Sequence, residues 1–386
     1  MTSLIVGGAL ANKYGNGGAA WTRLSWILGL RKLGFRVYFV EQLDECSEES
    51  GGAVSFRYSP AACYFMKVTE SFGLSDSSAL IYRNGKEIIG PSRTQLVAWF
   101  EDAAALINIT GHLSCSWLYP RARKKVYIDL DPGYTQVWQS DRALGAHLFT
   151  HDQFFTVGAN VGTLECSVPV DGISWRPIRQ PVVLEDWPRV FQGDPSRFTT
   201  VGSWRGPYGP LEYQGRRYGL KCHEFRKFLK LPGLCRDSRF ELALDIHGAD
   251  IRDLELLRRC GWRVRHARQA IPEPEEFRRF VQTSGAEFSV AQGVYVETRS
   301  GWFSDRTVRY LASGKPVLVQ ETGFARELPV GEGLLSFSTL QEAREGVSRI
   351  QSDYVHHCHA ARWLAEEFFD SDRVLGDLVG QIGVAP

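Results

Sequence analysis

The sequence lacks several features that would assign it to a specialised class of protein. No apolar run approaches the roughly 18 residues that a membrane-spanning helix needs. The eight cysteines are scattered and form no Cys-x-x-Cys pair, which in a long chain favours reduced thiols over a disulfide framework. The net charge is only +1, so electrostatics give no reason to expect nucleic acid or an anionic membrane as a partner. We therefore expect a cytoplasmic protein without a transmembrane segment.

What remains is the composition of an ordinary globular protein. Hydrophobic residues make up 44% of the chain and charged residues 23%, values typical of soluble domains. At 386 residues the chain is too long for one ordinary core, so two domains of roughly 180 residues each are expected. The apolar run at residues 4–6 is too short for a signal peptide and lacks a basic flank, so we interpret it as a first strand.

The chain opens with a pattern typical of a βαβ unit. Residues 3–7 form the first expected strand, and a glycine-rich loop leads into a helix over about 19–33 with Trp21 on its apolar face. Gly34 ends this helix, and residues 36–41 form the second strand. Such a unit requires a parallel sheet with a right-handed crossover.

The same alternation continues through both halves of the chain. Strands are expected at 106–110, 126–130, 197–203, 240–246, 262–266 and 287–291, and helices at 95–104, 222–229, 252–260, 274–283 and about 342–370. Four prolines between residues 177 and 195 mark a linker. The predicted fold class is α/β, with two Rossmann-like α/β domains at 1–185 and 196–345 that face each other across a cleft. The helices at 346–386 can return to the first domain.

Residues 300–320 carry the strongest local signal for function. Ser304 can cap a short helix with its hydroxyl, Gly314 supplies the left-handed stop, and residues 317–319 then form a buried strand. The start of this helix is polar and has Arg306 in its first turn. A helix start of that kind is suited to an anion such as a diphosphate.

These features together resemble the GT-B glycosyltransferases. The likeness rests on the glycine-rich loop after the first strand, on a second α/β domain opening with Val201-Gly202-Ser203, and on the segment Arg-Tyr-Leu-Ala-Ser-Gly-Lys-Pro-Val-Leu-Val at 309–319. The resemblance implies that the first domain binds an acceptor and the second a nucleotide sugar. It also implies that the segment at 300–320 holds the diphosphate and ribose of the donor.

One departure from the family separates this chain from the retaining family 4 pattern. That pattern places two glutamates eight residues apart before the glycine of the segment. Alignment on Gly314 puts Gly301 and Arg309 at those positions, so the paired-glutamate grip is missing. The retaining mechanism thereby loses its main support.

The predicted donor site lies at the helix start and in the loop that faces it. Arginine presents a planar, permanently charged fork to phosphate oxygens, which makes Arg306 the first candidate for the diphosphate and Arg205 the second. Asp305 is placed to meet the hydroxyls of the donor sugar, although an acid at this position also favours the helix dipole alone. The predicted donor-binding residues are Arg205, Ser304, Asp305, Arg306 and Thr307.

A general base for the acceptor is expected at a strand end that faces the cleft. His112 follows the strand at 106–110, Asp131 follows the strand at 126–130, and His151 is a third candidate. The residues alone do not rank the three, because a structural histidine, or a turn-forming Asp before Pro-Gly, has the same pattern.

The glycine-rich loop is a candidate acceptor or phosphate contact. Gly15, Gly17 and Gly18 let the backbone approach a ligand closely. The loop also scans as Gly-x-Gly-x-x-Ala, with Glu41 at the end of the second strand, which resembles a dinucleotide fingerprint. About seven residues separate the strand end from Gly15, whereas in a nicotinamide fold the first glycine follows the strand directly. No nicotinamide cofactor is therefore predicted.

Two further residue types complete the set of candidates. Trp138 can line an acceptor pocket by stacking on a sugar or aglycone. No metal site is predicted, because His356, His357 and His359 lie on a helix where adjacent positions point apart.

The sequence predicts a hexosyl-type transferase that moves a sugar from a nucleoside diphosphate sugar to a hydroxyl or amine. The acceptor is a small molecule or a glycan, and no metal or other cofactor is expected. The absence of the two glutamates favours a reaction that inverts the configuration of the anomeric carbon. A sugar-nucleotide epimerase or hydrolase of the same fold, or an inactive nucleotide-sugar-binding protein, are the alternatives. The donor sugar, the nucleotide base and the oligomeric state stay open.

Overall fold

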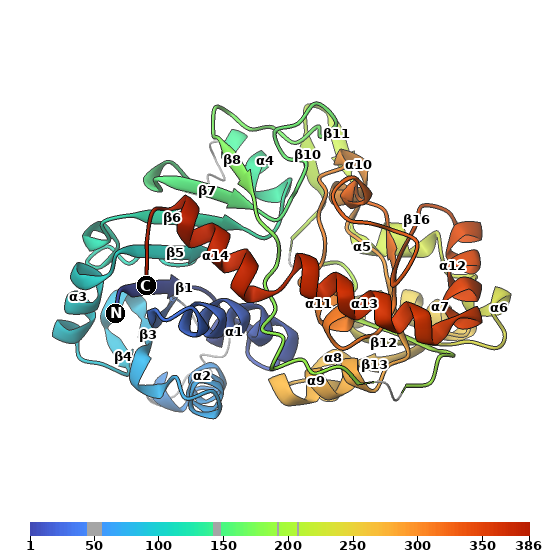
Figure 1. Cartoon of the computed structure of the whole chain (residues 1–386), viewed down its shortest axis with the longest axis horizontal. Coiled ribbons are helices and arrows are strands. Elements are labelled where there is room, and N and C mark those ends of the chain that lie inside the picture. Colours follow the sequence, from blue (N-terminus) through green and yellow to red (C-terminus); the bar gives the residue numbers. More distant parts are fainter. Residues whose placement is uncertain (45–55, 142–147, 191–192, 207) are drawn as a thin grey trace.

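Two parallel sheets lie side by side and form the two halves of the molecule (Figure 1). The structure is a computed structural model that describes residues 1–44, 56–141, 148–190, 193–206 and 208–386. The predicted α/β class with two Rossmann-like sheets is confirmed. The seven cysteines that the structure describes are free thiols, and Cys46 lies outside the described residues.

The first sheet has eight strands in the order β4-β3-β2-β1-β5-β6-β7-β8. Its strands are β1 (Ser3–Gly7), β2 (Arg36–Leu43), β3 (Ser78–Tyr82), β4 (Glu87–Ile89), β5 (Ala105–Ile109), β6 (Lys125–Asp129), β7 (Gln153–Thr156) and β8 (Trp175–Pro177). All pairs are parallel except β3 with β4. Helices α1 (Gly17–Lys32), α2 (Pro60–Ser71), α3 (Arg93–Asp102) and α4 (Tyr134–Ser140) belong to this half. The β1-α1-β2 unit was predicted, whereas β3, β4 and α2 were not.

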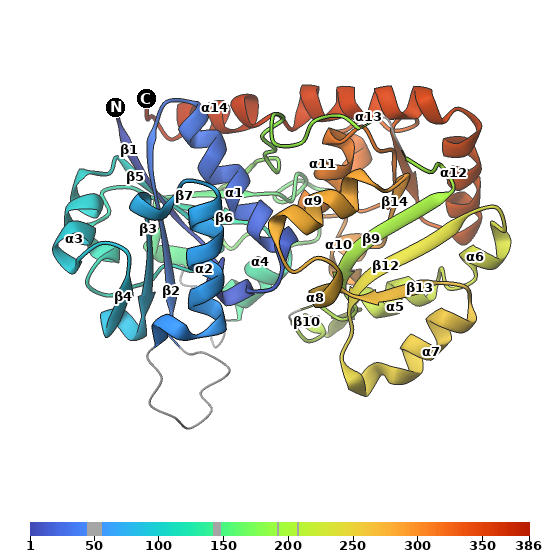
Figure 2. The same cartoon turned by 90° about the horizontal axis from the view of Figure 1, so that it is seen from below.

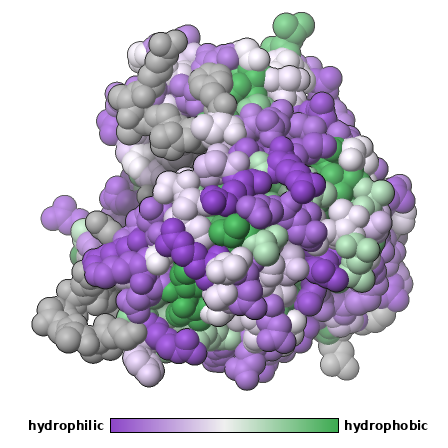
Figure 3. All heavy atoms as spheres, turned by 90° about the vertical axis from the view of Figure 1, so that its left-hand side faces the viewer, coloured by the Kyte–Doolittle hydropathy of each residue, from purple (hydrophilic) through white to green (hydrophobic). Residues whose placement is uncertain are grey.

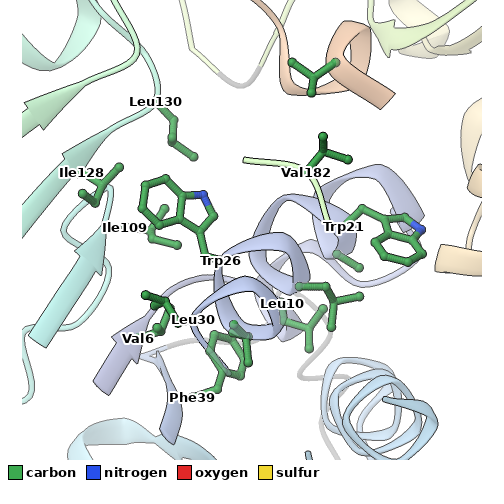
Figure 4. Close-up of a cluster of buried hydrophobic side chains, with 14 of the residues drawn as sticks. Val6, Leu10, Trp21, Trp26, Leu30, Phe39, Ile109, Ile128, Leu130 and Val182 are labelled. Carbon is green, nitrogen blue, oxygen red and sulfur yellow. The ribbon is translucent and has the colours of Figure 1, made fainter. Parts of the chain in front are cut away.

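Helix α1 is covered on more than one side, which its predicted single apolar face did not indicate. Figure 4 shows Trp26 directed toward Ile109 and Ile128 of the sheet, while Trp21 points away from them. Both tryptophans are fully buried. The Trp21 indole N–H donates to the carbonyl of Pro274 in the other half at 2.7 Å. The helix therefore belongs to the core and also joins the two halves.

The second sheet has six strands in the order β13-β12-β9-β14-β15-β16, all parallel. Its strands are β9 (Arg197–Ser203), β12 (Arg239–Asp245), β13 (Arg263–His266), β14 (Ala286–Ser289), β15 (Val317–Gln320) and β16 (Leu334–Phe337), and a separate hairpin consists of β10 (Leu211–Tyr213) and β11 (Arg216–Tyr218). Its helices are α5 (Lys221–Arg226), α6 (Leu231–Leu234), α7 (Ile251–Arg259), α8 (Ala267–Ala270), α9 (Pro274–Gln282), α10 (Gly293–Thr298) and α11 (Asp305–Ala312). Strand β9 has the predicted bounds.

The C-terminal helical region is divided, where the sequence predicted one long helix over about 342–370. It consists of α12 (Leu340–Ser352), α13 (Tyr354–Phe368) and α14 (Ser371–Gln381). Figure 2 shows α13 along the second half and α14 along the first. α14 packs on α1 so closely that a Cβ at Gly29 would lie 2.6 Å from Leu375 Cδ1.

The surface is mixed in character on the side formed by the first half. Figure 3 shows that polar residues dominate this face and that apolar ones occur in separate spots. Among the described helices, none combines the length and the apolar character that crossing a membrane requires.

Candidate functional site

A cleft of about 520 Å³ lies between the two halves. One wall consists of the loop after β1, the start of α1, and residues that follow β5 and β6. The facing wall consists of residues at the ends of β9 and β12 and the first residues of α11. Both walls therefore lie at the carboxyl ends of parallel strands, where open α/β sheets bind their ligands.

Helix α11 begins as the sequence predicts. The Ser304 hydroxyl accepts a hydrogen bond from the backbone N–H of Arg306 at 3.3 Å, and Gly314 after the helix has a φ of +70°. Asp305 and Arg306 line the cleft. Ser304 and Thr307 are buried and are not among the residues that line it. Ser304 thus acts as a cap. Of the four residues predicted to bind the donor at the start of α11, Asp305 and Arg306 reach the cleft.

Arg306 is buried rather than exposed, contrary to the prediction of an exposed helix start. Its side chain is 11% exposed. Nε donates to Glu287 Oε1 at 2.5 Å, Nη1 to the Val201 carbonyl at 2.8 Å and Nη2 to Ser289 Oγ at 2.5 Å. These bonds use three of the five guanidinium N–H groups. The strands β9 and β14 thereby fix the guanidinium at the wall of the cleft, with two N–H groups left for a ligand.

Lys221 is a cation close to the cleft that sequence reasoning missed, although it is not itself among the described residues that line the cleft. It is the first residue of α5, and a Cβ on Gly202, which lines the cleft, would lie 3.2 Å from its Nζ. Burial and the nearby Arg306 charge lower the pKa of Lys221 to about 7, against the opposing effect of Glu287. A bound anion would favour the charged ammonium. The available signal was a lysine at a helix start, one residue before the helix predicted at 222–229.

Arg205, the second predicted phosphate residue, has a different partner. Its Nε donates to Asp250 Oδ2 at 2.7 Å, and a second bond joins Nη2 to the other carboxylate oxygen. The side chain is 52% exposed and is not among the described residues that line the cleft. Arg205, predicted to bind phosphate, is therefore held by the carboxylate of Asp250, which lies 45 residues further along the chain.

We expect Lys221→Gln to weaken the binding of a nucleoside diphosphate by about tenfold to a hundredfold, because it removes a charge-assisted contact worth about 1.5–3 kcal/mol. Arg205→Gln is the matched control, since it also removes one cation near the end of β9, and it should leave the affinity within about twofold. Isothermal titration calorimetry with nucleoside diphosphates measures both. Equal losses in the two variants would contradict this assignment.

Asp131 is the predicted base that lies best for the role. It follows β6, lines the cleft, and its Oδ1 accepts a hydrogen bond from the Tyr295 hydroxyl of α10 at 2.8 Å. Burial raises the pKa of Asp131 to about 6, and the Tyr295 hydrogen bond acts in the opposite direction. Asp129, two residues earlier, is fully buried and accepts bonds from Thr135, Gln136 and Thr156. Asp129 therefore holds the end of β6 in place, and Asp131 carries the accessible carboxylate.

The two histidine candidates have different surroundings. His112 lines the cleft, but burial and the charges of Arg23 and Lys13 lower its pKa to about 3, which makes it a weak base. His151 is buried, bonds to Asn108 Nδ2 at 3.0 Å and packs between the rings of Tyr119 and Tyr127. It is not among the described residues that line the cleft. His151, the third candidate base, therefore packs among aromatic rings and away from the described residues that line the cleft.

Trp138 also lies away from the cleft lining. It packs edge-on against Tyr208, with ring centroids 4.5 Å apart, and against Tyr134. Of these three rings, that of Tyr208 lines the cleft. Tyr208 is therefore the ring of this group that faces the cleft, and the ligand contact assigned to Trp138 stays a prediction.

The glycine-rich loop is divided between the cleft and the packing of the two halves. Gly15 and Gly18 line the cleft, whereas Gly17 is buried against the other half, where a Cβ would lie 2.1 Å from the Glu273 carbonyl oxygen. Glu41 accepts bonds from the backbone N–H groups of residues 10–12 at 2.6–2.8 Å. Its carboxylate therefore binds the protein's own loop and is not available to the ribose of a dinucleotide.

Several solved structures have the same arrangement, and their similarity to this protein covers nearly the whole chain. An alpha-glucosyltransferase in complex with UDP and DNA containing an HMU base has 12% identity and a TM-score of 0.60, with 100% of each chain covered. HepE from Anabaena in complex with UDP and glucose has 11% identity and a TM-score of 0.57, covering 99% of this chain and 100% of that one. Sucrose-phosphate synthase from Thermosynechococcus elongatus has 11% identity and a TM-score of 0.56, covering 99% of both chains. The fold is GT-B. Sequence comparison finds no matching family model and no matching curated protein.

Within the GT-B fold, the two positions where family 4 has glutamates are occupied in ways that exclude that role. Gly301 has a φ of +75°, and a Cβ there would lie 2.9 Å from the backbone nitrogen of Asn160. Arg309 is 1% exposed and its guanidinium donates to Ser25 of α1 at 3.2 Å and to Asp305 at 3.1 Å. The first position thus requires glycine, and the second joins the two halves of the molecule.

No group of three or more His, Cys, Asp or Glu side chains able to hold a metal ion occurs in the described part of the chain. His357, from the late histidine cluster, is buried and its Nδ1 accepts from the Gly333 backbone N–H at 3.0 Å. The neighbouring His356 contacts Glu332 at 3.1 Å. These two adjacent histidines have separate partners.

Proposed function

We propose that this protein transfers a sugar from a nucleoside diphosphate sugar to a hydroxyl or amine of an acceptor. The observation that carries the proposal is that one cleft has a candidate base on one wall and cationic side chains on the opposite wall. Asp131 lies at a strand end of the first half, and Arg306 lies on the second half with Lys221 nearby. The neighbours of the same fold support it, since the alpha-glucosyltransferase and HepE were solved with UDP bound.

The donor diphosphate would bind at the wall formed by the second half. Two free N–H groups of Arg306, the ammonium of Lys221 and the N-terminal amides of α11 all favour an anion there. When the bond between the anomeric carbon and the diphosphate oxygen breaks, negative charge develops on that oxygen. These fixed groups stabilise it in the transition state. They supply the neutralisation that a divalent cation provides in other enzymes, which is why we propose a metal-independent reaction.

Asp131 would act as the general base. It takes the proton from the acceptor as the acceptor oxygen or nitrogen attacks the anomeric carbon from the face opposite to the diphosphate. One bond forms while the other breaks, so the configuration of the anomeric carbon inverts. The raised pKa of about 6 keeps Asp131 mostly ionised at neutral pH and closer to the operating pH than an ordinary aspartate.

The acceptor would occupy the wall formed by the first half, near Asp131 and Gly15. The proposed partners are therefore a nucleotide-sugar donor and a small molecule or glycan. An epimerase, a hydrolase or an inactive binding protein would use the same donor wall, but none of these needs an acceptor.

The test is a turnover assay of purified protein with UDP-sugars, other nucleotide sugars and a panel of acceptors, with and without EDTA. We expect release of the nucleoside diphosphate that depends on the acceptor, unchanged by EDTA, and a product of inverted anomeric configuration by NMR. Free sugar or an epimer formed without any acceptor would instead identify a hydrolase or an epimerase. Tight binding of UDP with no turnover across the panel would identify a binding protein.

A further inference from the structure

The acceptor wall carries more positive charge than the proposed reaction uses. Lys13, in the loop after β1, and Arg23, on α1, both line the cleft on this side. His112 lies on the same wall. The donor diphosphate has its own cations on the opposite wall, so these two have no assigned role.

Arg23 is buried without a strong partner. It is 8% exposed, Nη1 donates to the carbonyl of Ala19 at 3.3 Å, and its Nε is buried and makes no hydrogen bond within the described residues. A Cβ at Gly8 would lie 3.2 Å from Arg23 Cγ, so the stem lies flat on the end of β1. Buried guanidinium groups are normally hydrogen-bonded, because an unmade bond at a charged group costs free energy.

Lys13 is similar in character. It is half buried in the cleft, and its ammonium makes no hydrogen bond or ion pair with any residue that the structure describes. The carboxylates around the two cations are engaged elsewhere. Glu41 accepts from three backbone N–H groups, Asp305 bonds to Thr22 at 2.6 Å and to Arg309, and Asp131 accepts from Tyr295.

The charges of Lys13 and Arg23 also affect the pKa of His112, the third residue of this wall. After burial, the charges of Arg23 and Lys13 are the causes that lower the pKa of His112. Both cations therefore lie close enough to His112 to act on it, which places their charges together on this part of the cleft wall.

We propose that Lys13 and Arg23, with His112 beside them, form a subsite for an anionic group, a phosphate or a carboxylate, on the acceptor. This inference rests on the proposed transferase function. The acceptor would bind with its anionic group on Lys13 and Arg23 and its nucleophile at Asp131. Neutral sugars would lack this contact and would be poorer acceptors.

The donor diphosphate is a second anion that fits these two cations. Saturation of the protein with UDP distinguishes it from an anionic group on the acceptor. The experiment is a calorimetric titration of inorganic phosphate, and separately of acetate, into the UDP-saturated protein. We expect one phosphate site, with Lys13→Gln and Arg23→Gln each weakening phosphate binding by about tenfold or more. Both variants should keep their affinity for UDP within about twofold. Arg36→Gln and Lys86→Gln, exposed cations of the same half, are the matched controls and should bind phosphate normally.

Three outcomes overturn the inference: no phosphate binding to the UDP-saturated protein, phosphate binding unchanged in both cleft variants, or a parallel loss of UDP binding in those variants. The last would assign the two cations to the donor. If Arg23→Gln does not fold, the phosphate titration of Lys13→Gln, a change in the loop before α1, still tests the inference. A failure of the transferase proposal looks different, because it appears as absent acceptor-dependent turnover, whereas the phosphate titration reports on the subsite with or without turnover.

Discussion

Replacement of Asp131 by Asn is expected to lower kcat by about 10²–10⁴-fold, the usual contribution of a positioned general base. The change keeps the shape of the side chain and its bond from Tyr295, so the fold and the binding of UDP should be preserved. Steady-state kinetics with the best donor and acceptor, together with UDP calorimetry on the same preparation, measure both. A variant that retains more than about a tenth of the activity would exclude Asp131 as the base.

The pH dependence provides an independent check on the same carboxylate. Burial raises the pKa of Asp131 to about 6, so kcat/KM should fall as the pH drops through about 6, where the base becomes protonated. The Tyr295 hydrogen bond lowers that pKa, so Tyr295→Phe should move the acidic limb to higher pH. Tyr134→Phe is the matched control, because it removes a neighbouring hydroxyl that makes no hydrogen bond to Asp131. A limb that stays in place in Tyr295→Phe would mean that another group titrates.

Replacement of Arg306 by Ala is expected to lower the free energy of unfolding by about 3–5 kcal/mol, in addition to any loss of donor binding. The reason is Glu287, which is 0% exposed and would lose the cation that it pairs with at 2.5 Å while remaining buried. Its Oε2 already has no hydrogen-bond partner among the described residues. A urea titration followed by circular dichroism measures the change in stability.

The double variant Arg306→Ala, Glu287→Gln separates the two effects of this arginine. It removes the buried charge together with its partner, so most of the lost stability should return while donor binding stays weak. If the single variant is as stable as the parent protein, the ion pair between Arg306 and Glu287 does not contribute to the stability of the fold. If the double variant binds UDP normally, Arg306 has no role in holding the diphosphate.

Local features of the fold were predicted well because they depend on residues close together in the chain. The bounds of β9, the Ser304 cap and the Gly314 stop follow from backbone preferences and from hydrogen bonds within a few residues. The resemblance to GT-B proteins rested on these same local features. The division of the C-terminal helical region was not predicted, because α12 and α13 end at Asp353 and Phe369 without a proline or glycine signal.

The helix start at 304–307 also shows the limit of that reasoning. Its position was correct, but the exposure of Arg306 was not, since partners on two other strands, β9 and β14, had to be known before its burial could be inferred. The same limit applies to Arg205 and Lys221, which lie 16 residues apart on one connection after β9. Only the packing of that connection decides that Lys221 lies against the cleft and that Arg205 binds Asp250 outside it.

The sequence by itself determined the α/β class, the two-sheet organisation and the capped, polar helix start that can hold an anion. Only the tertiary structure decided which charged groups share the cleft and which of the three candidate bases lies there with an ionisable carboxylate. The physical reason is separation along the chain. The bond from Tyr295 to Asp131 joins residues 164 positions apart, and that from Arg309 to Ser25 joins residues 284 apart. No local preference encodes such contacts, because they form only when two separately folded sheets close on one another.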